Sequence, residues 1–165
     1  DAGLLTMQPQ AVDLSQQLRD LSELLRPGAA TRGLALVVDA PPEAIVWADP
    51  VRVRQVLLNL LGNAVKFTER GGISVRVRPA RGGRLAVVVH DTGVGIPRDQ
   101  HARLFQPFAQ VARGATAAAG TGLGLTISRR LVDAMGGGLR FRSQPGRGSS
   151  FRLVLPRPRN LARAA

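Results

Sequence analysis

The stretch from Gln55 to Lys66 constrains the fold of this chain more than any other. It reads Gln-Val-Leu-Leu-Asn-Leu-Leu-Gly-Asn-Ala-Val-Lys. At roughly 100° per residue, its apolar side chains spread over one broad face of a helix, and that face must be buried. The polar side chains fall on a narrow strip opposite, which we call the polar strip: Gln55, Asn59, Asn63 and Lys66. We expect the rest of the chain to pack around this helix.

The two asparagines of the polar strip need an explanation. Asparagine is mildly unfavourable inside a helix, because its amide competes for backbone hydrogen bonds. One explanation is a solvated face. The other is a cleft in which two amide oxygens and an ammonium group hold a divalent cation and phosphate oxygens. Composition favours the cleft, because Lys66 is the only lysine among 23 lysine and arginine residues.

Length and composition set broad limits. The 165 residues suit one domain, and no run approaches the roughly 20 apolar residues of a membrane span. The first residues do not resemble a signal peptide, and the start at Asp1 without methionine suggests a piece of a longer protein. The chain has no cysteine, which excludes disulfides and cysteine zinc sites and fits a cytoplasmic location.

The net charge of +12 raises the question of nucleic-acid binding. The arginines, however, are scattered from Arg19 to Arg163, and the five phenylalanines and one tryptophan offer few rings for stacking on bases. We therefore expect no nucleic-acid partner.

Apolar periodicity and turn residues predict four helices. The first ends at Pro27-Gly28, with a brief continuation to Thr31 left open. The second begins strongly, because Asp49 offers a capping oxygen before a proline. The expected helices run from Asp13 to Pro27, from Pro50 to about Thr68, from Pro97 to about Phe105, and from Leu125 through Met135.

Six strands are expected between and after these helices. The first shows little alternation, so we expect it to be buried. The short turn at Arg81 to Arg84 makes its two flanking strands antiparallel neighbours. The strands are Leu34 to Asp39, Ile45 to Ala48, Ile73 to Arg78, Leu85 to His90, Leu139 to Ser143, and Ser150 to Leu155. This order predicts an α+β fold, a two-layer sandwich with a mixed, mostly antiparallel sheet and helices on one face.

Two glycine motifs follow predicted elements. Asp91 stands at a strand end before Gly93 and Gly95, where an ordinary turn is the alternative. A buried carboxylate needs a partner, and it can accept a hydrogen bond from the exocyclic amino group of adenine. Gly120 to Gly124 opens a helix, so its free amides predict an anion site. It matches neither the Walker nor the Rossmann pattern, and the aperiodic stretch before it predicts a functional or disordered loop.

Four motifs in this order resemble the catalytic ATP-binding domain of bacterial sensor histidine kinases: Asn59-x-x-x-Asn63, Asp91-x-Gly-x-Gly95, Phe105-x-x-Phe108 and Gly120-x-Gly-x-Gly124. The resemblance covers about Val12 to Pro156 and implies the Bergerat fold, shared with gyrase, mismatch-repair and heat-shock chaperone ATPases. It also implies that residues 1–11 end a linker from a missing dimerisation and phosphoacceptor domain, and that residues 12–156 form the catalytic domain. Residues 157–165 would then be a flexible tail or linker.

The resemblance implies a role for each motif. Asn59 and Asn63 would coordinate Mg²⁺ directly or through water, and Lys66 would contact the phosphates of ATP. Asp91 would bind the adenine amino group, with Gly93 and Gly95 allowing close approach. Two phenylalanines would border a mobile lid over the ATP, although plain core packing remains an alternative for them. The border residues are Phe105 and Phe108. The far hinge of the lid, whose amides would contact phosphate, consists of Gly120, Thr121, Gly122, Leu123 and Gly124.

The resemblance also distinguishes ATP hydrolysis from phosphoryl transfer to a protein. Hydrolysing members of the superfamily have glutamate where this chain has Asn59, and an amide cannot serve as a general base. Transfer of the γ-phosphoryl group to a protein histidine remains possible. Neither His90 nor His101 has the neighbours of the family's acceptor histidine, so the isolated chain is expected to be a monomer that binds ATP without autophosphorylation.

The expected partners are the dimerisation domain of the same protein and a response regulator receiver domain, without direct membrane contact. The parent protein is expected to be anchored in the bacterial inner membrane. The lid, Gln110 to Ala119, is rich in alanine, with Arg113 its only charge. A degenerate regulatory module without kinase activity therefore remains an alternative. Another Bergerat-fold ATPase is a second alternative, which Asn59 disfavours.

Overall fold

The structure is a computed structural model that describes residues 6–110 and 121–162. Within these residues, one sheet has five strands in the order β2-β4-β5-β7-β6. β2 is parallel to β4, and the other neighbours are antiparallel. The strands are β2 (Ala35–Asp39), β4 (Gly72–Ala80), β5 (Arg84–Asp91), β6 (Gly138–Gln144) and β7 (Gly148–Pro156). The predicted mixed, mostly antiparallel sheet is confirmed.

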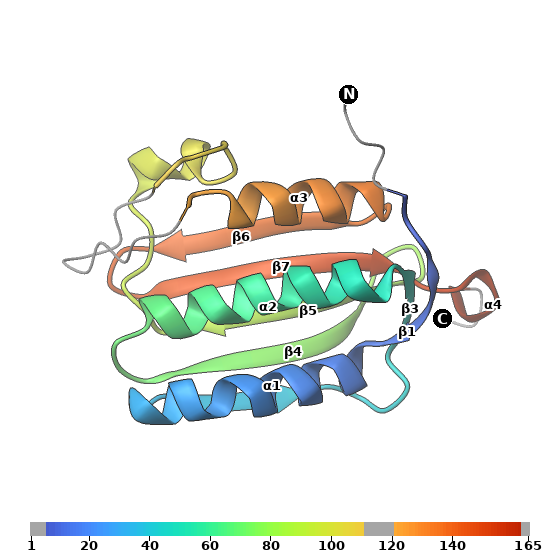
Figure 1. The fold of residues 1–165 in the computed structure, drawn as a ribbon, viewed down its shortest axis with the longest axis horizontal. Coiled ribbons are helices and arrows are strands. Elements are labelled where there is room, and N and C mark those ends of the chain that lie inside the picture. Colours follow the sequence, from blue (N-terminus) through green and yellow to red (C-terminus); the bar gives the residue numbers. More distant parts are fainter. Residues whose placement is uncertain (1–5, 111–120, 163–165) are drawn as a thin grey trace.

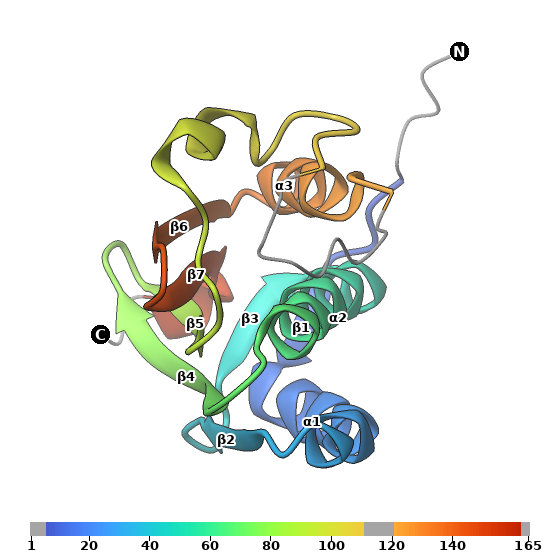
Figure 2. The ribbon, with the colours of Figure 1, turned by 90° about the vertical axis from the view of Figure 1, so that its left-hand side faces the viewer.

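Three helices cover one face of this sheet, as Figures 1 and 2 show: α1 (Leu14–Thr31), α2 (Pro50–Phe67) and α3 (Gly124–Ala134). The core lies between the two layers. Leu18 of α1, Leu57 and Leu61 of α2, Val75 of β4 and Leu153 of β7 are all buried there. Burying side chains of this kind stabilises a fold by about 1.5–3 kcal/mol each. The predicted two-layer α+β sandwich with helices on one face is therefore confirmed.

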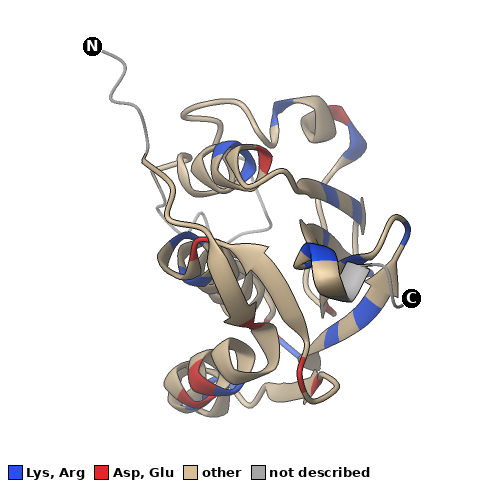
Figure 3. Cartoon of the chain, turned by 90° about the vertical axis from the view of Figure 1, so that its right-hand side faces the viewer, with Lys and Arg blue, Asp and Glu red and all other residues tan. Residues whose placement is uncertain are grey.

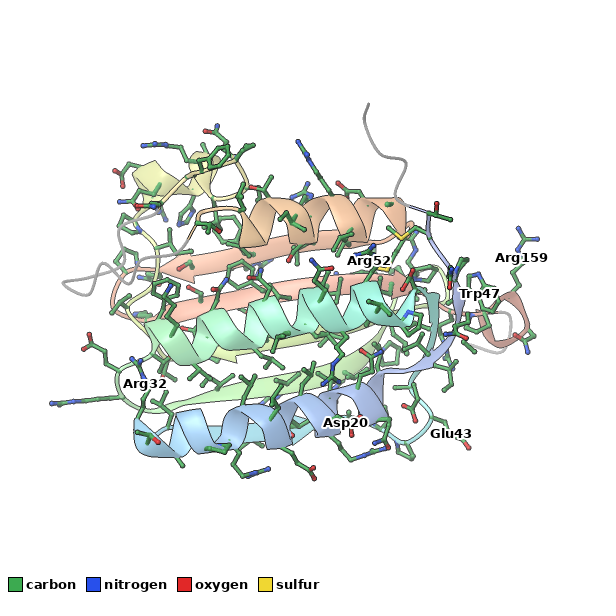
Figure 4. All side chains as sticks on the ribbon, in the orientation of Figure 1. Asp20, Arg32, Glu43, Trp47, Arg52 and Arg159 are labelled. Carbon is green, nitrogen blue, oxygen red and sulfur yellow. The ribbon has the colours of Figure 1, made fainter. Side chains whose placement is uncertain are left out.

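The central helix α2 is capped at both ends. The Asp49 carboxylate accepts hydrogen bonds from the N–H groups of Val51 (3.0 Å) and Arg52 (3.2 Å), as the sequence predicted. At the other end, the Arg32 guanidinium reaches from the end of α1 (Figure 4) and donates to the carbonyl oxygens of Lys66 (3.2 Å) and Thr68 (3.3 Å). Both ends of α2 are thus held in place by side chains.

The first helix differs from the prediction, because Pro27 lies inside α1 and does not end it. A proline inside a helix removes one hydrogen bond and costs about 3 kcal/mol. Two features offset this cost. Ala29 is buried against the core, and its carbonyl oxygen accepts hydrogen bonds from Arg32 (3.1 Å) and Leu34 (2.9 Å). The last turn of α1 is thereby held from outside the helix.

The ends of the chain and the sheet edge also differ from expectation. β1 (Gln10–Asp13), which the sequence did not reveal, pairs antiparallel with β3 (Ile45–Ala48) in a separate two-stranded sheet. The predicted burial of β2 is wrong, because it is an edge strand and Val37 is 58% exposed. The predicted loose tail contains a one-turn helix, α4 (Arg159–Ala162).

Among residues 6–110 and 121–162, no helix has both the length and the apolar character needed to cross a membrane.

Candidate functional site

The polar strip of α2 meets the beginning of α3 at Asn59. The Asn59 Nδ2 donates a hydrogen bond to the Ser128 hydroxyl at 3.0 Å. A side chain at Gly124 would overlap the Asn59 Oδ1, so only glycine allows this close approach of the two helices. The amide is thereby oriented with its nitrogen on Ser128 and its oxygen toward the first residue of α3.

The remaining members of the polar strip differ in their surroundings. Asn63 and Lys66 are half-buried along α2, and the Lys66 Nζ lies 5.3 Å from the centroid of the Phe67 ring. Gln55 is exposed, and its Oε1 accepts a hydrogen bond from Arg52 at 3.2 Å. The part of the polar strip from Asn59 to Lys66 therefore forms the candidate site.

Asp91 is buried at the end of β5, with 4% of its surface exposed. Its Oδ1 accepts hydrogen bonds from the N–H groups of Gly93 (2.8 Å) and Ser149 (3.3 Å). Gly148 presses against the Asp91 carbonyl so closely that a side chain there would overlap it. The carboxylate is thus held by a backbone group of its own loop and by one from a segment 58 residues further along the chain.

The two glycines after Asp91 are required by the protein itself. A side chain at Gly93 would overlap the carbonyl oxygen of Phe67, and one at Gly95 would overlap that of Gln144. Gly95 also has a φ of 72°, a conformation that glycine adopts without strain. The Gly93 contact joins the Asp91 loop to the end of α2, next to Lys66, and the Gly95 contact joins the loop to the end of β6.

The two predicted lid-border phenylalanines have different environments. The Phe105 ring packs edge-on against Phe141 at 5.7 Å and lies 5.0 Å from the Arg129 guanidinium, so it contributes to packing. Phe108 is 73% exposed and has a φ of 60°. Its backbone touches Gly122, where a side chain would lie 2.8 Å from the Phe108 carbonyl carbon. Phe108 and Gly122 thus meet although residues 111–120 separate them in the sequence.

The described part of the second glycine motif leads directly into α3. Thr121 is exposed, and Leu123 is the N-cap residue but makes no side-chain capping hydrogen bond. The N-cap side chain therefore supplies no acceptor for the first N–H groups of α3, and the positive end of the helix dipole favours an anion there. Gly120 and the predicted lid residues up to Ala119, apart from Gln110, lie outside the described residues.

The motifs form one continuous series of contacts. Gly93 lies against Phe67 beside Lys66, Asn59 lies against Gly124, and Gly122 lies against Phe108. Sequence reasoning missed two members of this site. Ser128 could have been found, because it lies one helical turn after Gly124, on the side of α3 that faces α2. Ser149 could not, because no local pattern links it to Asp91.

The comparisons with known proteins agree with this arrangement. Residues 48–159 match the family model described as histidine kinase-, DNA gyrase B-, and HSP90-like ATPase. The chain belongs to this ATPase family. As the motifs predicted, it is a catalytic ATP-binding domain of the sensor histidine kinase type.

Two curated relatives illustrate the similarity. The domain is 41% identical over 153 residues to the aerobic respiration control sensor protein ArcB of Escherichia coli (strain K12), covering 90% of this chain and 20% of that protein. It is 39% identical over 160 residues to the signal transduction histidine-protein kinase BarA of the same strain, covering 92% of this chain and 17% of that protein. The domain thus spans about a fifth of the length of these relatives.

Two solved structures share the fold. The crystal structure of full-length ShkA in complex with AMPPNP superposes with a TM-score of 0.82 at 37% identity, covering 94% of this chain and 32% of that one. The nucleotide-free catalytic domain of histidine kinase ThkA superposes with a TM-score of 0.79 at 26% identity, covering 92% of this chain and 97% of that one. The ThkA domain therefore matches this chain over nearly its whole length.

Proposed function

We propose that this domain binds ATP together with Mg²⁺ and donates the γ-phosphoryl group to a histidine on a separate dimerisation domain of its parent protein. The observation that carries the proposal is the contact between Asn59 and Gly124, which brings an amide oxygen of α2 to the N-terminus of α3. Amide oxygens suit a hard cation, and a helix N-terminus suits phosphate. The likeness to ShkA, which was solved in complex with AMPPNP, supports nucleotide binding.

The donor set of the site fits Mg²⁺. Bound Mg²⁺ neutralises phosphate charge that develops during phosphoryl transfer. Asn59 and Asn63 would hold it through their amide oxygens, directly or through water, because the Asn59 nitrogen is already engaged by Ser128. Among the described residues, no group of three or more histidines, cysteines, aspartates or glutamates offers another metal site.

The other motif residues would bind the nucleotide. Lys66 would contact the phosphates, and so would the amides of the glycine motif from Gly120 through Gly124. Asp91 would accept a hydrogen bond from the adenine amino group, and the two backbone N–H groups on its Oδ1 keep the carboxylate in one orientation. Phe108 would border the lid.

Phosphoryl transfer is favoured over hydrolysis by the chemistry of the polar strip. An amide at Asn59 cannot activate water as a general base. The two histidines are also unsuited as acceptors within the chain. His90 is exposed on the face of the sheet away from α2, whereas the His101 ring binds the Ile96 carbonyl at 2.9 Å and packs against Phe141 at 5.1 Å. The isolated domain should therefore bind ATP without phosphorylating itself.

The proposal also covers the partners of the domain and the location of its parent protein. Its partners would be the dimerisation and histidine-phosphotransfer domain of the same protein and a response regulator receiver domain, with the isolated domain a monomer. The parent would be anchored in the bacterial inner membrane, with this domain in the cytoplasm and without nucleic-acid or direct membrane contact. The support is that ArcB and BarA carry the names of sensor and signal-transduction proteins, of which the domain matches a fifth.

Calorimetric titration with ATP and AMPPNP, with and without Mg²⁺, tests the proposal. We expect micromolar, adenine-selective binding that Asp91→Asn abolishes and that Asn63→Ala makes insensitive to Mg²⁺. Added dimerisation domain should acquire phosphate from ATP, whereas the isolated domain should not. Absence of nucleotide binding by the wild type would refute the proposal in favour of a degenerate regulatory module, and phosphate on His90 or His101 would refute the assignment of an external acceptor.

A further inference from the structure

The face of the sheet opposite the helices is strongly basic. Figure 3 shows bands of Lys and Arg on strands of this sheet. Side chains alternate along a strand, so the register places one row of arginines on this face. Among the described strand residues they are Arg76 and Arg78 of β4, Arg84 of β5, Arg140 and Arg142 of β6, and Arg152 of β7, all exposed. The only acidic strand residue on this face in the described ranges is Asp39, which forms an ion pair with Arg78.

Part of this face is hollowed into a groove of about 620 Å³. Its lining, which we call the basic groove, consists of Arg81, Arg84, Gly138, Arg140, Arg152 and Val154. A side chain at Gly138 would meet no atom within 4 Å, so the glycine leaves this space open between the arginines. The volume lies within the range of about 300–1,000 Å³ found for small-molecule sites.

No acidic side chain in the part of the chain that the structure describes forms an ion pair with an arginine of the basic groove. Arg140 and Arg152 are direct cross-strand partners, and like charges in this position destabilise a sheet. An anion in the groove would relieve this repulsion.

We propose that the basic groove binds a small anion carrying two or more phosphate groups. Guanidinium groups bind phosphate oxygens in pairs through parallel hydrogen bonds, and four of them surround a space of suitable size. No aromatic residue lines the groove, so recognition rests on the phosphates and not on a stacked base. Confinement to one end of the sheet favours a compact anion over an extended nucleic acid.

This site is distinct from the proposed nucleotide site, and its existence does not depend on the proposed function. Arg84 and Asp91 are the first and last residues of β5, which separates them by roughly 23 Å at about 3.3 Å per residue. Arg84 also points away from the helices, whereas α2 and α3 with the candidate site lie on the other face. An anion in the basic groove would therefore leave the nucleotide site accessible.

Titration calorimetry of the domain with inorganic tripolyphosphate, in buffer without Mg²⁺, tests this inference. The Lys66→Gln variant removes phosphate contacts at the nucleotide site, and we expect it to retain one tripolyphosphate site. The Arg140→Gln/Arg152→Gln variant should weaken that binding by roughly tenfold for each arginine removed. The matched control, Arg19→Gln/Arg26→Gln, removes two exposed charges from α1 and should bind like the wild type.

Each contrary outcome would overturn the inference. Absence of tripolyphosphate binding by the wild type would show that the basic groove is not an anion site. Binding that Lys66→Gln abolishes and Arg140→Gln/Arg152→Gln preserves would assign the anion to the nucleotide site. Equal weakening by the α1 control would show attraction to net charge alone. Hexaglutamate binding with the same affinity and the same arginine dependence would assign the groove to an acidic protein surface. Circular dichroism checks the fold, and Arg84→Gln replaces the double variant if that variant unfolds.

Discussion

Replacing Gly124 with alanine tests the contact on which the candidate site depends. The new methyl group would overlap the Asn59 Oδ1, which is the end of a side chain that can rotate. Rotation would break the 3.0 Å hydrogen bond from Asn59 to Ser128 and leave a buried hydroxyl without this partner. That loss costs about 1–3 kcal/mol, whereas alanine is favoured over glycine in a helix by up to about 1 kcal/mol.

The two effects predict a net destabilisation of about 0–3 kcal/mol for Gly124→Ala, together with a clear loss of ATP affinity. In an Asn59→Ala background the clash is absent, so the same change should stabilise the domain by up to about 1 kcal/mol. Urea unfolding of the four proteins therefore predicts a coupling free energy of roughly 1–3 kcal/mol. Gly28→Ala in α1, where a side chain meets no atom within 4 Å, is the matched control and should be stabilising.

Additive changes in the unfolding free energy, within about 0.5 kcal/mol, would refute the proposed contact between Asn59 and Gly124. So would an unchanged nucleotide affinity in a Gly124→Ala protein that remains folded, because the moved amide oxygen would then have no part in the site.

Two further predictions concern stability. Hydrogen bonds to the Asp49 carboxylate, first from Gln8 N–H at 3.0 Å, lower its pKa from the ordinary value of 3.8. The Asp49 carboxylate should therefore contribute fully to the unfolding free energy above the unfolded pKa of about 4, and this contribution should disappear as the pH falls through the lower folded pKa. We expect Asp49→Asn to flatten the dependence of the unfolding free energy on pH below about pH 4. An unchanged pH dependence would contradict this. Phe105→Ala should lower the unfolding free energy by about 2 kcal/mol, whereas Phe108→Ala, at 73% exposure, should change it by less than about 0.5 kcal/mol in urea titrations; equal losses would contradict the different packing of the two rings.

Several features of the fold could be predicted because their causes are local. Asp49 followed by proline starts α2, since the capping oxygen and the constrained φ both act within one turn. The turn at Arg81 to Arg84 pairs β4 with β5, because so short a connection leaves no other partner in reach. The polar strip was visible for the same reason, since a helix repeats every 3.6 residues.

The errors arose where local and non-local effects compete. Pro27 normally ends a helix, yet the burial of Ala29 and the hydrogen bonds from the following turn continue α1 beyond it. β2 is apolar enough for a central strand, but its position at the edge of the sheet exposes Val37. β1 has only 4 residues and acquires its conformation from pairing with β3, which lies more than 30 residues along the chain.

The candidate site shows the same division. Its residue types and the spacing of Asn59, Asn63 and Asp91 can be read from the chain, because each motif belongs to one element. The contacts of Asn59 with Ser128 and of Asp91 with Ser149 join residues 69 and 58 positions apart, so they exist only once the helices lie on the sheet. The chemistry of the site therefore follows from local sequence, whereas the orientation of its amide and carboxylate follows from the packing of distant segments.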